Sequence, residues 1–234
     1  MRTDSMLWLG VNPGLGGGAA LVGPGRELLG YWPCPTVRVG DGDRRAYDRD
    51  GLRLVARRAA ERGARVVLER QQPLPGGGAV SGWSLACGYM GWLMALEGEG
   101  LPLHEVPPPT WKRALNLVAP GETRPRRPLA APELVAAWKA QRPGQEQGKR
   151  ALARWRRARP KPEAAADAAW ALEDKLARAS RRKAGLHLMC ARALELFPRV
   201  DLRATGRSKV PDHNRAAALL LAVYGQEHLE VRGG

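Results

Sequence analysis

Three short apolar runs, separated by sequences that favour turns, open the chain and limit its fold more than any other feature. They cover Met6 to Val11, Gly18 to Val22 and Arg26 to Trp32, and the breaks between them are Asn12-Pro13-Gly14 and Pro24-Gly25. Runs of this length between glycine and proline residues are typical of strands joined by tight turns. We therefore expect the chain to begin with a three-stranded antiparallel meander.

Helices and further strands alternate after the meander. Apolar spacing and helix caps predict four elements: a helix from Asp48 or Asp50 to about Arg62, a buried strand at Arg65 to Leu68 that ends at Glu69, a helix from Ser81 to Leu96, and a strand at Leu103 to Val106. Together with the meander, this order predicts an α/β fold in which helices flank a mixed five-stranded sheet.

The segment 119–183 differs from the rest of the chain in charge and in pattern. It holds 17 Lys and Arg against 7 Asp and Glu, an excess of 10 positive charges out of a net charge of +15. Prolines divide it into three predicted helices, at 132–140, 146–159 and 163–183, and it has no strand pattern. We therefore assign residues 1–118 and 184–234 to an α/β core and residues 119–183 to a basic α-helical insertion.

Two interpretations of this insertion stay open. In one, the basic lobe binds phosphate, and its tryptophans either pack a small core or stack on bases. In the other, it is a solvated helical hairpin whose arginines only face water. For most of the three tryptophans Trp138, Trp155 and Trp170 we favour packing over base stacking.

The overall charge limits the class of partner. A net charge of +15 and a pI near 10.8 favour a polyanionic partner. There is no apolar run of about 18 residues and no signal-peptide pattern, so we expect a cytoplasmic protein that contacts no membrane. Cys34, Cys87 and Cys190 lie far apart, which supports neither a disulfide framework nor a zinc ribbon, and we expect buried thiols.

The C-terminal part predicts two more helices, separated by a loop. The first covers Leu186 to Leu196 and ends before Pro198, and the second runs from Asp212 to about Tyr224. The second is apolar from Ala216 to Val223, so its polar start marks the place where a buried helix reaches a surface.

Four segments of the core resemble, in the same order, the motifs of one protein family. The first segment is Leu9 to Leu15 with the returning run Gly16 to Val22, and the second is Glu69 with Pro75-Gly76, Ser81, Trp83 and Ser84. The third is Pro109 to Leu115, and the fourth is Phe197-Pro198 with Lys209 to Ala222. The family has Gly-(Ile/Val)-Asp-Pro-Gly at the first place and Pro-x-x-Trp-Lys at the third. It is the family of RuvC-type Holliday-junction resolvases among the ribonuclease H-like nucleases, and the last segment resembles its phage and fungal branches.

The resemblance implies a ribonuclease H-like fold and a structure-selective DNA endonuclease. Such an enzyme resolves four-way junctions and other branched DNA by two-metal-ion phosphodiester hydrolysis, with Mg²⁺, or Mn²⁺ in its place, held by acidic residues. In this chain the metal-binding positions are Asn12, Glu69 and Asp212, and the catalytic positions add His213 and Asn214.

The resemblance and the placement of basic groups also indicate partners. The expected DNA-binding residues are Gln71, Ser81, Trp83, Lys112, Arg113, Lys183, Arg207, Lys209 and Arg215. Family members act as homodimers, which suits paired cuts on a two-fold junction, and the apolar helix from Ser81 to Leu96 is the expected dimer surface. A phage-encoded member would act in its bacterial host cell.

Two positions depart from the family pattern. Asn12 stands where the family has its first aspartate, and Ala217 stands where an acid is usual in the closing helix, with Asn214 one turn before it. Because an amide oxygen replaces a carboxylate poorly beside two dications, we expect DNA cleavage to be roughly 100-fold slower or worse. Either Asn12 is an engineered knockout, or this branch places its acids differently.

Three alternatives have weaker or different support. A protein that binds branched DNA without cutting it would carry Asn12 and Ala217 naturally. The pattern Gly14 to Ala19 fits a dinucleotide-binding fingerprint, but no helix has room to begin there before Pro24. Actin-like ATPases and sugar kinases share the strand-turn-strand opening, but those chains are longer and are not basic.

Overall fold

A computed structural model describes residues 6–71, 78–118, 128–144, 148–162, 164–203 and 208–229. The chain divides into two compact units, one formed by residues 1–118 and 185–234 and the other by residues 119–184.

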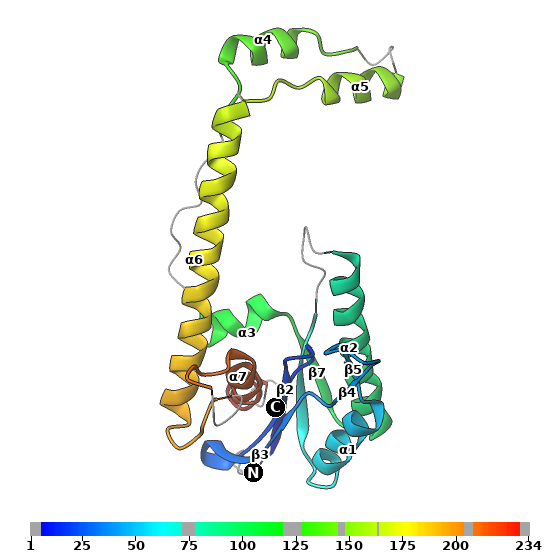
Figure 1. Cartoon of the computed structure of the whole chain (residues 1–234), viewed down its shortest axis with the longest axis vertical. Coiled ribbons are helices and arrows are strands. Elements are labelled where there is room, and N and C mark those ends of the chain that lie inside the picture. The colour runs from blue at the N-terminus through cyan, green and yellow to red at the C-terminus, as the bar shows by residue number, and fades with distance from the viewer. Residues whose placement is uncertain are drawn as a thin grey trace. The chain divides into compact units, whose positions relative to one another are not determined.

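A mixed five-stranded sheet forms the centre of the first unit (Figure 1). Its strands are β1 (Trp8–Asn12), β2 (Gly18–Gly23), β3 (Glu27–Pro33), β6 (Arg65–Glu69) and β7 (Leu103–Val106). Their order across the sheet is β3-β2-β1-β6-β7, and the first three pair antiparallel, whereas β1, β6 and β7 run parallel. The predicted meander and the predicted five-stranded mixed sheet are both confirmed.

Helices cover both faces of this sheet. On one face lies α7 (His213–His228), which packs against β1, β2 and β6. On the other face α1 (Arg49–Ala60) and α2 (Ala79–Gly98) pack against the sheet and each other. Gly10 permits the close approach of α7 to β1, because a Cβ at this position would overlap the Ala218 carbonyl oxygen.

Several short elements were not predicted from the sequence. These are the two-stranded sheet of β4 (Thr36–Arg38) and β5 (Arg45–Tyr47), a 3-10 turn at Pro24–Arg26, and α3 (Pro108–Ala114). Each is too short to show an apolar period, and the strands β4 and β5 have no fully buried residue.

The long helix α6 (Ala164–Leu196) corrects the sequence prediction of two helices, at 163–183 and 186–196. The expected break at Ala184-Gly185 does not occur. A glycine inside a helix costs only about 1 kcal/mol relative to alanine, and the flanking residues favour helix. The helix therefore continues across the boundary between the two units. The second unit also contains α4 (Pro132–Ala140) and α5 (Gly148–Arg157).

The cysteine prediction is correct for one residue of three. Cys34 is buried, Cys190 is half-buried, and Cys87 is exposed on α2, so the expectation of three buried thiols is wrong. The helix α2 is apolar on all sides, so the sequence could not show which of its faces packs on the sheet. None of the described helices has the length and apolar character needed to cross a membrane.

Candidate functional site

Two polar side chains end adjacent parallel strands and face the same side of the sheet. Asn12 is the last residue of β1 and Glu69 is the last residue of β6, its parallel neighbour. Trp8 and Val67, an even number of residues earlier on each strand, pack in the core beneath α7. Since side chains alternate between faces along a strand, Asn12 and Glu69 also point to the α7 side. Both are buried, with 9% and 7% of their surface exposed.

The Glu69 carboxylate is held by two hydrogen bonds from side chains. The Trp111 indole Nε1–H donates to Oε1 (3.1 Å), and the Gln71 amide donates to Oε2 (3.2 Å). Burial raises the pKa of this carboxyl, and the nearby Lys112 charge and the two hydrogen bonds only partly offset that rise. Glu69 is therefore a positioned acid whose charged form is disfavoured by its surroundings.

An amide pair joins the end of β1 to the start of α7. The Asn12 Nδ2 donates to Asn214 Oδ1 (3.4 Å), and Asn12 Oδ1 accepts a long hydrogen bond from the Gly14 backbone N–H (3.5 Å). The glycine loop that follows β1 lies against this pair, because a Cβ at Gly16 would come within 3.2 Å of Asn214 Nδ2. Asn12 and Asn214, both predicted as catalytic positions, are therefore brought together.

Asp212 is the N-cap of α7. Its side chain accepts a hydrogen bond from the Asn214 backbone N–H (2.8 Å), which satisfies one of the free donors at the helix start. Its charge also contributes, after burial, to the raised pKa values of the Tyr31 hydroxyl, which is about 12, and of the Cys190 thiol. His213, the first residue of α7, is half-buried.

Arg215, a predicted DNA-binding residue, is held by its own unit. Its guanidinium lies 4.2 Å from the centre of the Tyr31 ring, a cation–π geometry, and its Nη1 donates to the Arg203 carbonyl oxygen (3.3 Å). These contacts fix the guanidinium beside the start of α7 and leave less of it free for a phosphate.

The donors at this sheet edge do not fit a pair of Mg²⁺ ions. Its carboxylates are Glu69, whose oxygens accept hydrogen bonds from N–H groups, and Asp212, which caps α7. Asn12 contributes a neutral amide, and Ala217 is buried in the core and contributes no oxygen. Two dications would have only these two carboxylates to neutralise their charge, fewer acids than the resemblance implies. Within the described ranges, no group of three or more His, Cys, Asp and Glu side chains could hold a metal ion.

The predicted DNA-binding residues fall into several places. Gln71 and Lys112 adjoin Glu69, and Lys112 Nζ lies 5.2 Å from the centre of the Trp111 ring. Arg113 and Lys209 are exposed. Lys183 is exposed and belongs to the other unit. Arg207 and the Pro75-Gly76 match lie outside the described residues.

The first turns of α2 lie at the same end of the sheet. Because α2 connects the parallel strands β6 and β7, it begins at the carboxyl end of β6, and Gly88 packs against the Pro13 carbonyl oxygen. Ser81 and Trp83 precede Gly88 and are exposed, with 74% of Trp83 accessible. Trp83, one of the expected DNA-binding residues, is therefore accessible, whereas Trp92 farther along α2 is fully buried.

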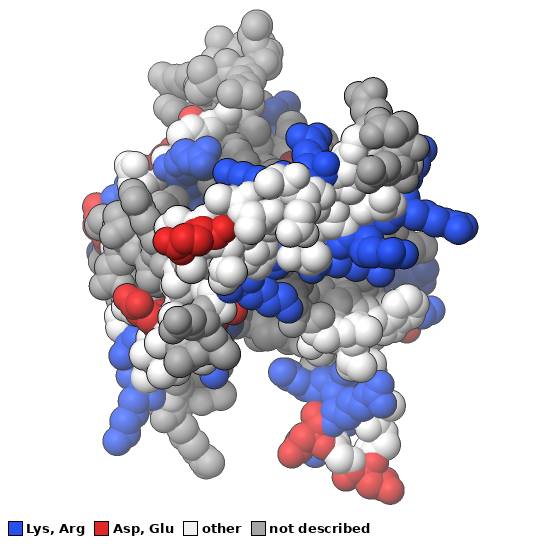
Figure 2. Space-filling model, turned by 90° about the horizontal axis from the view of Figure 1, so that it is seen from above, with Lys and Arg blue, Asp and Glu red and all other residues white. Residues whose placement is uncertain are grey.

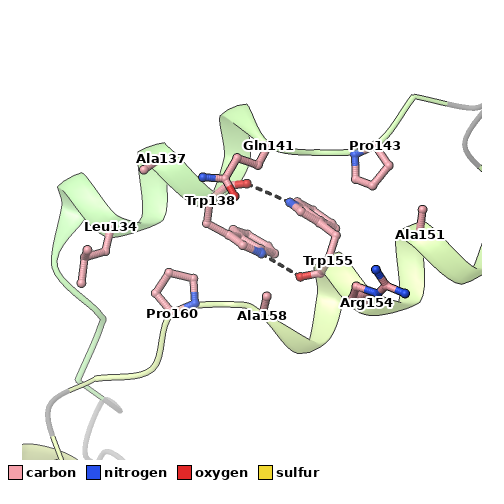
Figure 3. Close-up of a pocket in the computed structure, with 10 residues that line it drawn as sticks. All are labelled: Leu134, Ala137, Trp138, Gln141, Pro143, Ala151, Arg154, Trp155, Ala158 and Pro160. Atoms are coloured by element: carbon pink, nitrogen blue, oxygen red, sulfur yellow. Dashed lines mark hydrogen bonds between the residues drawn. The ribbon is translucent and has the colours of Figure 1, made fainter.

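The second unit holds a tryptophan pair in its helical hairpin of α4 and α5 (Figure 3). The Trp138 and Trp155 rings stack with centroids 4.1 Å apart and planes at 5°. Each indole Nε1–H donates to the backbone carbonyl oxygen of the other tryptophan, at 2.9 and 2.8 Å. The rings lie beside an open cavity of about 550 Å³ between the two helices. For these two tryptophans the packing interpretation is confirmed.

Sequence reasoning missed three of these contacts. The Pro-x-x-Trp-Lys segment identified Trp111 but not its hydrogen bond to Glu69, and nothing pointed to Tyr31 as the partner of Arg215. The Trp138–Trp155 pair left a visible signal, since the pattern Trp-x-x-x-Arg-Pro occurs at 138–143 and again at 155–160.

Comparison with known proteins adds no relative, since no protein-family model and no curated protein matches the chain. The resemblance to RuvC-type resolvases therefore rests on the residues of this chain alone.

Proposed function

We propose that the first unit is a ribonuclease H-like core of the RuvC type that recognises four-way and other branched DNA. We further propose that Asn12 leaves it unable to cut DNA at an appreciable rate. One observation carries the proposal. Asn12 and Glu69 end adjacent parallel strands on the face that meets the start of α7, where the amide of Asn214 contacts Asn12. These are the places at which the resemblance puts the acids of a nuclease.

Binding of DNA at this edge is supported by the groups around it. Lys112 adjoins Glu69, and Arg113 and Lys209 are exposed cations on neighbouring elements of the same unit. Trp83 provides an exposed aromatic surface on the first turns of α2. Cations would contact phosphates, and an indole could pack against the bases that a branch point leaves unstacked.

Cleavage is where the chain departs from the family. The resemblance assigns hydrolysis to two metal ions, and the donors present do not fit them. An aspartate at position 12 would add the missing carboxylate beside Glu69. It would also lose the Asn12 Nδ2 donor that holds Asn214 Oδ1, leaving that oxygen free for another partner. The variant Asn12→Asp is therefore the direct test of the proposal.

The experiment compares this chain with Asn12→Asp in binding and cutting. Both proteins are titrated against a synthetic four-way junction and against linear duplex, and cleavage is followed in Mg²⁺. We expect both to prefer the junction, and Asn12→Asp to cut it at least roughly 100-fold faster than the parent. The double variant Asn12→Asp/Glu69→Gln is the control and should not cut, because it again lacks one of the two neighbouring carboxylates.

The outcomes separate the alternatives. Junction preference without cleavage by either protein favours a natural binder that recruits other factors. Equal affinity of both proteins for junction and duplex contradicts the proposal.

A homodimer forms part of this proposal. Three exposed side chains, Cys87, Met90 and Met94, follow one face of α2 at helical spacing. An uncharged stripe of this kind suits a second copy of the chain, which would place two sites around a two-fold junction. Light scattering should give the mass of two chains, and a mass of one chain at all concentrations would refute the dimer.

A further inference from the structure

The α4–α5 hairpin is built on a duplicated segment. Residues 138–143 read Trp-Lys-Ala-Gln-Arg-Pro, and residues 155–160 read Trp-Arg-Arg-Ala-Arg-Pro. In each copy the tryptophan lies in the last turn of its helix, the arginine follows four residues later, and the proline comes next. Because proline cannot continue a helix, both copies end their helices in the same way.

The two copies pack on each other with nearly equal geometry. Beyond the stacked rings and the two indole-to-carbonyl hydrogen bonds, Arg142 lies 5.9 Å from the centre of the Trp155 ring, and Arg159 lies 5.8 Å from that of Trp138. Each tryptophan therefore has one ring face against its partner, its N–H bonded to a carbonyl, and an arginine close by. Little aromatic surface remains for stacking on bases.

Apart from the ring contacts of Arg142 and Arg159, the cations of the hairpin have no carboxylate partner among the described residues. Residues 128–162 contain nine Lys and Arg against Glu133 and Glu146, and all nine are exposed. Over the stretches that the structure describes, none of the nine forms an ion pair. Figure 2 shows Lys and Arg side chains bordering the uncharged middle of this surface.

Three of these arginines form a stripe along α5. Arg150, Arg154 and Arg157 are spaced i, i+4 and i+7, so their side chains leave one face of the helix. A row of unpaired guanidinium groups on a fixed helix suits a row of phosphates, because guanidinium donors match phosphate oxygens in geometry and charge.

We propose that the hairpin 128–162 is a clamp for the phosphate backbone of duplex DNA, in which the tryptophan pair sets the fold and the arginine stripe makes the contacts. The choice of DNA as the polyanion rests on the proposed function, whereas the clamp itself does not depend on the sheet-edge site. Binding of this kind is independent of base sequence and weakens steeply with salt. It would add affinity for the arms of a branched substrate without adding preference for the branch point.

The test replaces the three arginines of the stripe and compares the effect on DNA binding with that of replacing three arginines elsewhere. The variant Arg150→Ala/Arg154→Ala/Arg157→Ala is matched by Arg53→Ala/Arg58→Ala/Arg62→Ala, which removes three exposed arginines from α1 and its end. Fluorescence anisotropy with a labelled short duplex, over a series of salt concentrations, gives the affinity and its salt slope. The stripe variant should lose about 10-fold or more in affinity and flatten the slope by roughly 3 units. The α1 variant should change both much less.

Two further measurements keep the result interpretable. The variant with lysine at the same three hairpin positions preserves the charge, and it should retain most of the affinity if the contacts are to phosphate. Circular dichroism establishes that each variant keeps its helices, and alanine favours helix at exposed positions.

Certain results would contradict the clamp or assign the surface to another partner. Equal losses in the two alanine variants would mean that only net charge matters, and an unchanged salt slope would mean that the stripe does not contact phosphate; either result overturns the clamp. Stripe-dependent binding to phosphatidylserine vesicles, without stripe-dependent binding to duplex, would assign the surface to membranes instead. Loss of junction preference or of Asn12→Asp cleavage would refute the proposed function and leave the clamp standing, since the clamp is measured on linear duplex.

Discussion

Trp111 in the sheet unit and Trp138 in the hairpin both use an indole N–H as a hydrogen-bond donor, but for different purposes. Trp111 is fully buried and donates to the Glu69 carboxylate, which lies at the end of a strand. Trp138 is half-buried and donates to the Trp155 backbone carbonyl. The first bond positions an acid whose pKa is raised by burial, and the second fixes the conformation of a small hairpin.

The Lys and Arg side chains of the two regions also differ in whether they pair with a carboxylate. In the sheet unit, Arg26, Arg57 and Arg203 each pair with a carboxylate, at 2.8, 3.4 and 2.8 Å. In the hairpin the nine cations have no carboxylate partner among the described residues. Surface ion pairs contribute little to stability, so the difference concerns what remains available to an external anion. Substitutions of Glu69 and of the buried or paired tryptophans test whether the two regions are as distinct as their contacts indicate.

The largest effect is expected from Trp111→Phe. This change removes the donor to Glu69 Oε1 and leaves a buried carboxylate oxygen without that hydrogen bond, in addition to losing ring volume. We expect a loss of about 2–4 kcal/mol in the free energy of unfolding, measured by urea denaturation. A smaller loss would mean that Lys112 and Gln71 suffice to hold the acid.

Trp92→Phe is the matched control for Trp111→Phe. Trp92 is equally buried, but its indole nitrogen has no oxygen or nitrogen acceptor among the described residues, and the Cys34 thiol that it influences is a weak acceptor. Its replacement should therefore cost only the lost packing, about 1–2 kcal/mol. If both variants lose equal stability, the bond to Glu69 contributes nothing measurable.

A smaller effect, of opposite sign, is expected from Glu69→Gln. Burial raises the pKa of Glu69 above its ordinary value of 4.5, so the folded chain binds this proton more tightly than the unfolded chain. The resulting stabilisation is present below the unfolded pKa and is lost as pH rises through the folded pKa. Removing the charge should therefore raise the melting temperature at neutral pH, by roughly 2–4 °C for each kcal/mol, and change it little below about pH 4.

The control for Glu69→Gln is Glu97→Gln, an exposed glutamate at the end of α2. It should leave the melting temperature unchanged at both pH values. A Glu69→Gln variant that is less stable than the parent at neutral pH would show that the charged carboxylate is favoured in the folded chain.

The sequence predicted the sheet unit well because its strands and its helices α1 and α7 have clear apolar periods and caps. Asp48, one of the two predicted starts, caps α1, and α7 begins directly after its N-cap Asp212, where the sequence predicted the helix to start. The hydrogen bond between Trp111 and Glu69 could not be predicted, because the two residues are 42 positions apart in the sequence. They come into contact because β7 pairs with β6 and is followed directly by α3. The continuity of α6 could not be predicted because Gly185 is a poor helix former, whereas its neighbours favour helix.

The smallest effect is expected from Trp138→Phe, and it should stay within the hairpin. Phenylalanine keeps a stacked ring and loses only the N–H donor to the Trp155 carbonyl, which costs about 1 kcal/mol. Because the duplicated segments pack with equal geometry, Trp155→Phe should cost the same amount. Hydrogen exchange should report faster opening of 132–157 in both variants, while urea denaturation of the sheet unit stays unchanged. Unequal effects of the two variants would mean that the two copies of the segment contribute unequally to the stability of the hairpin.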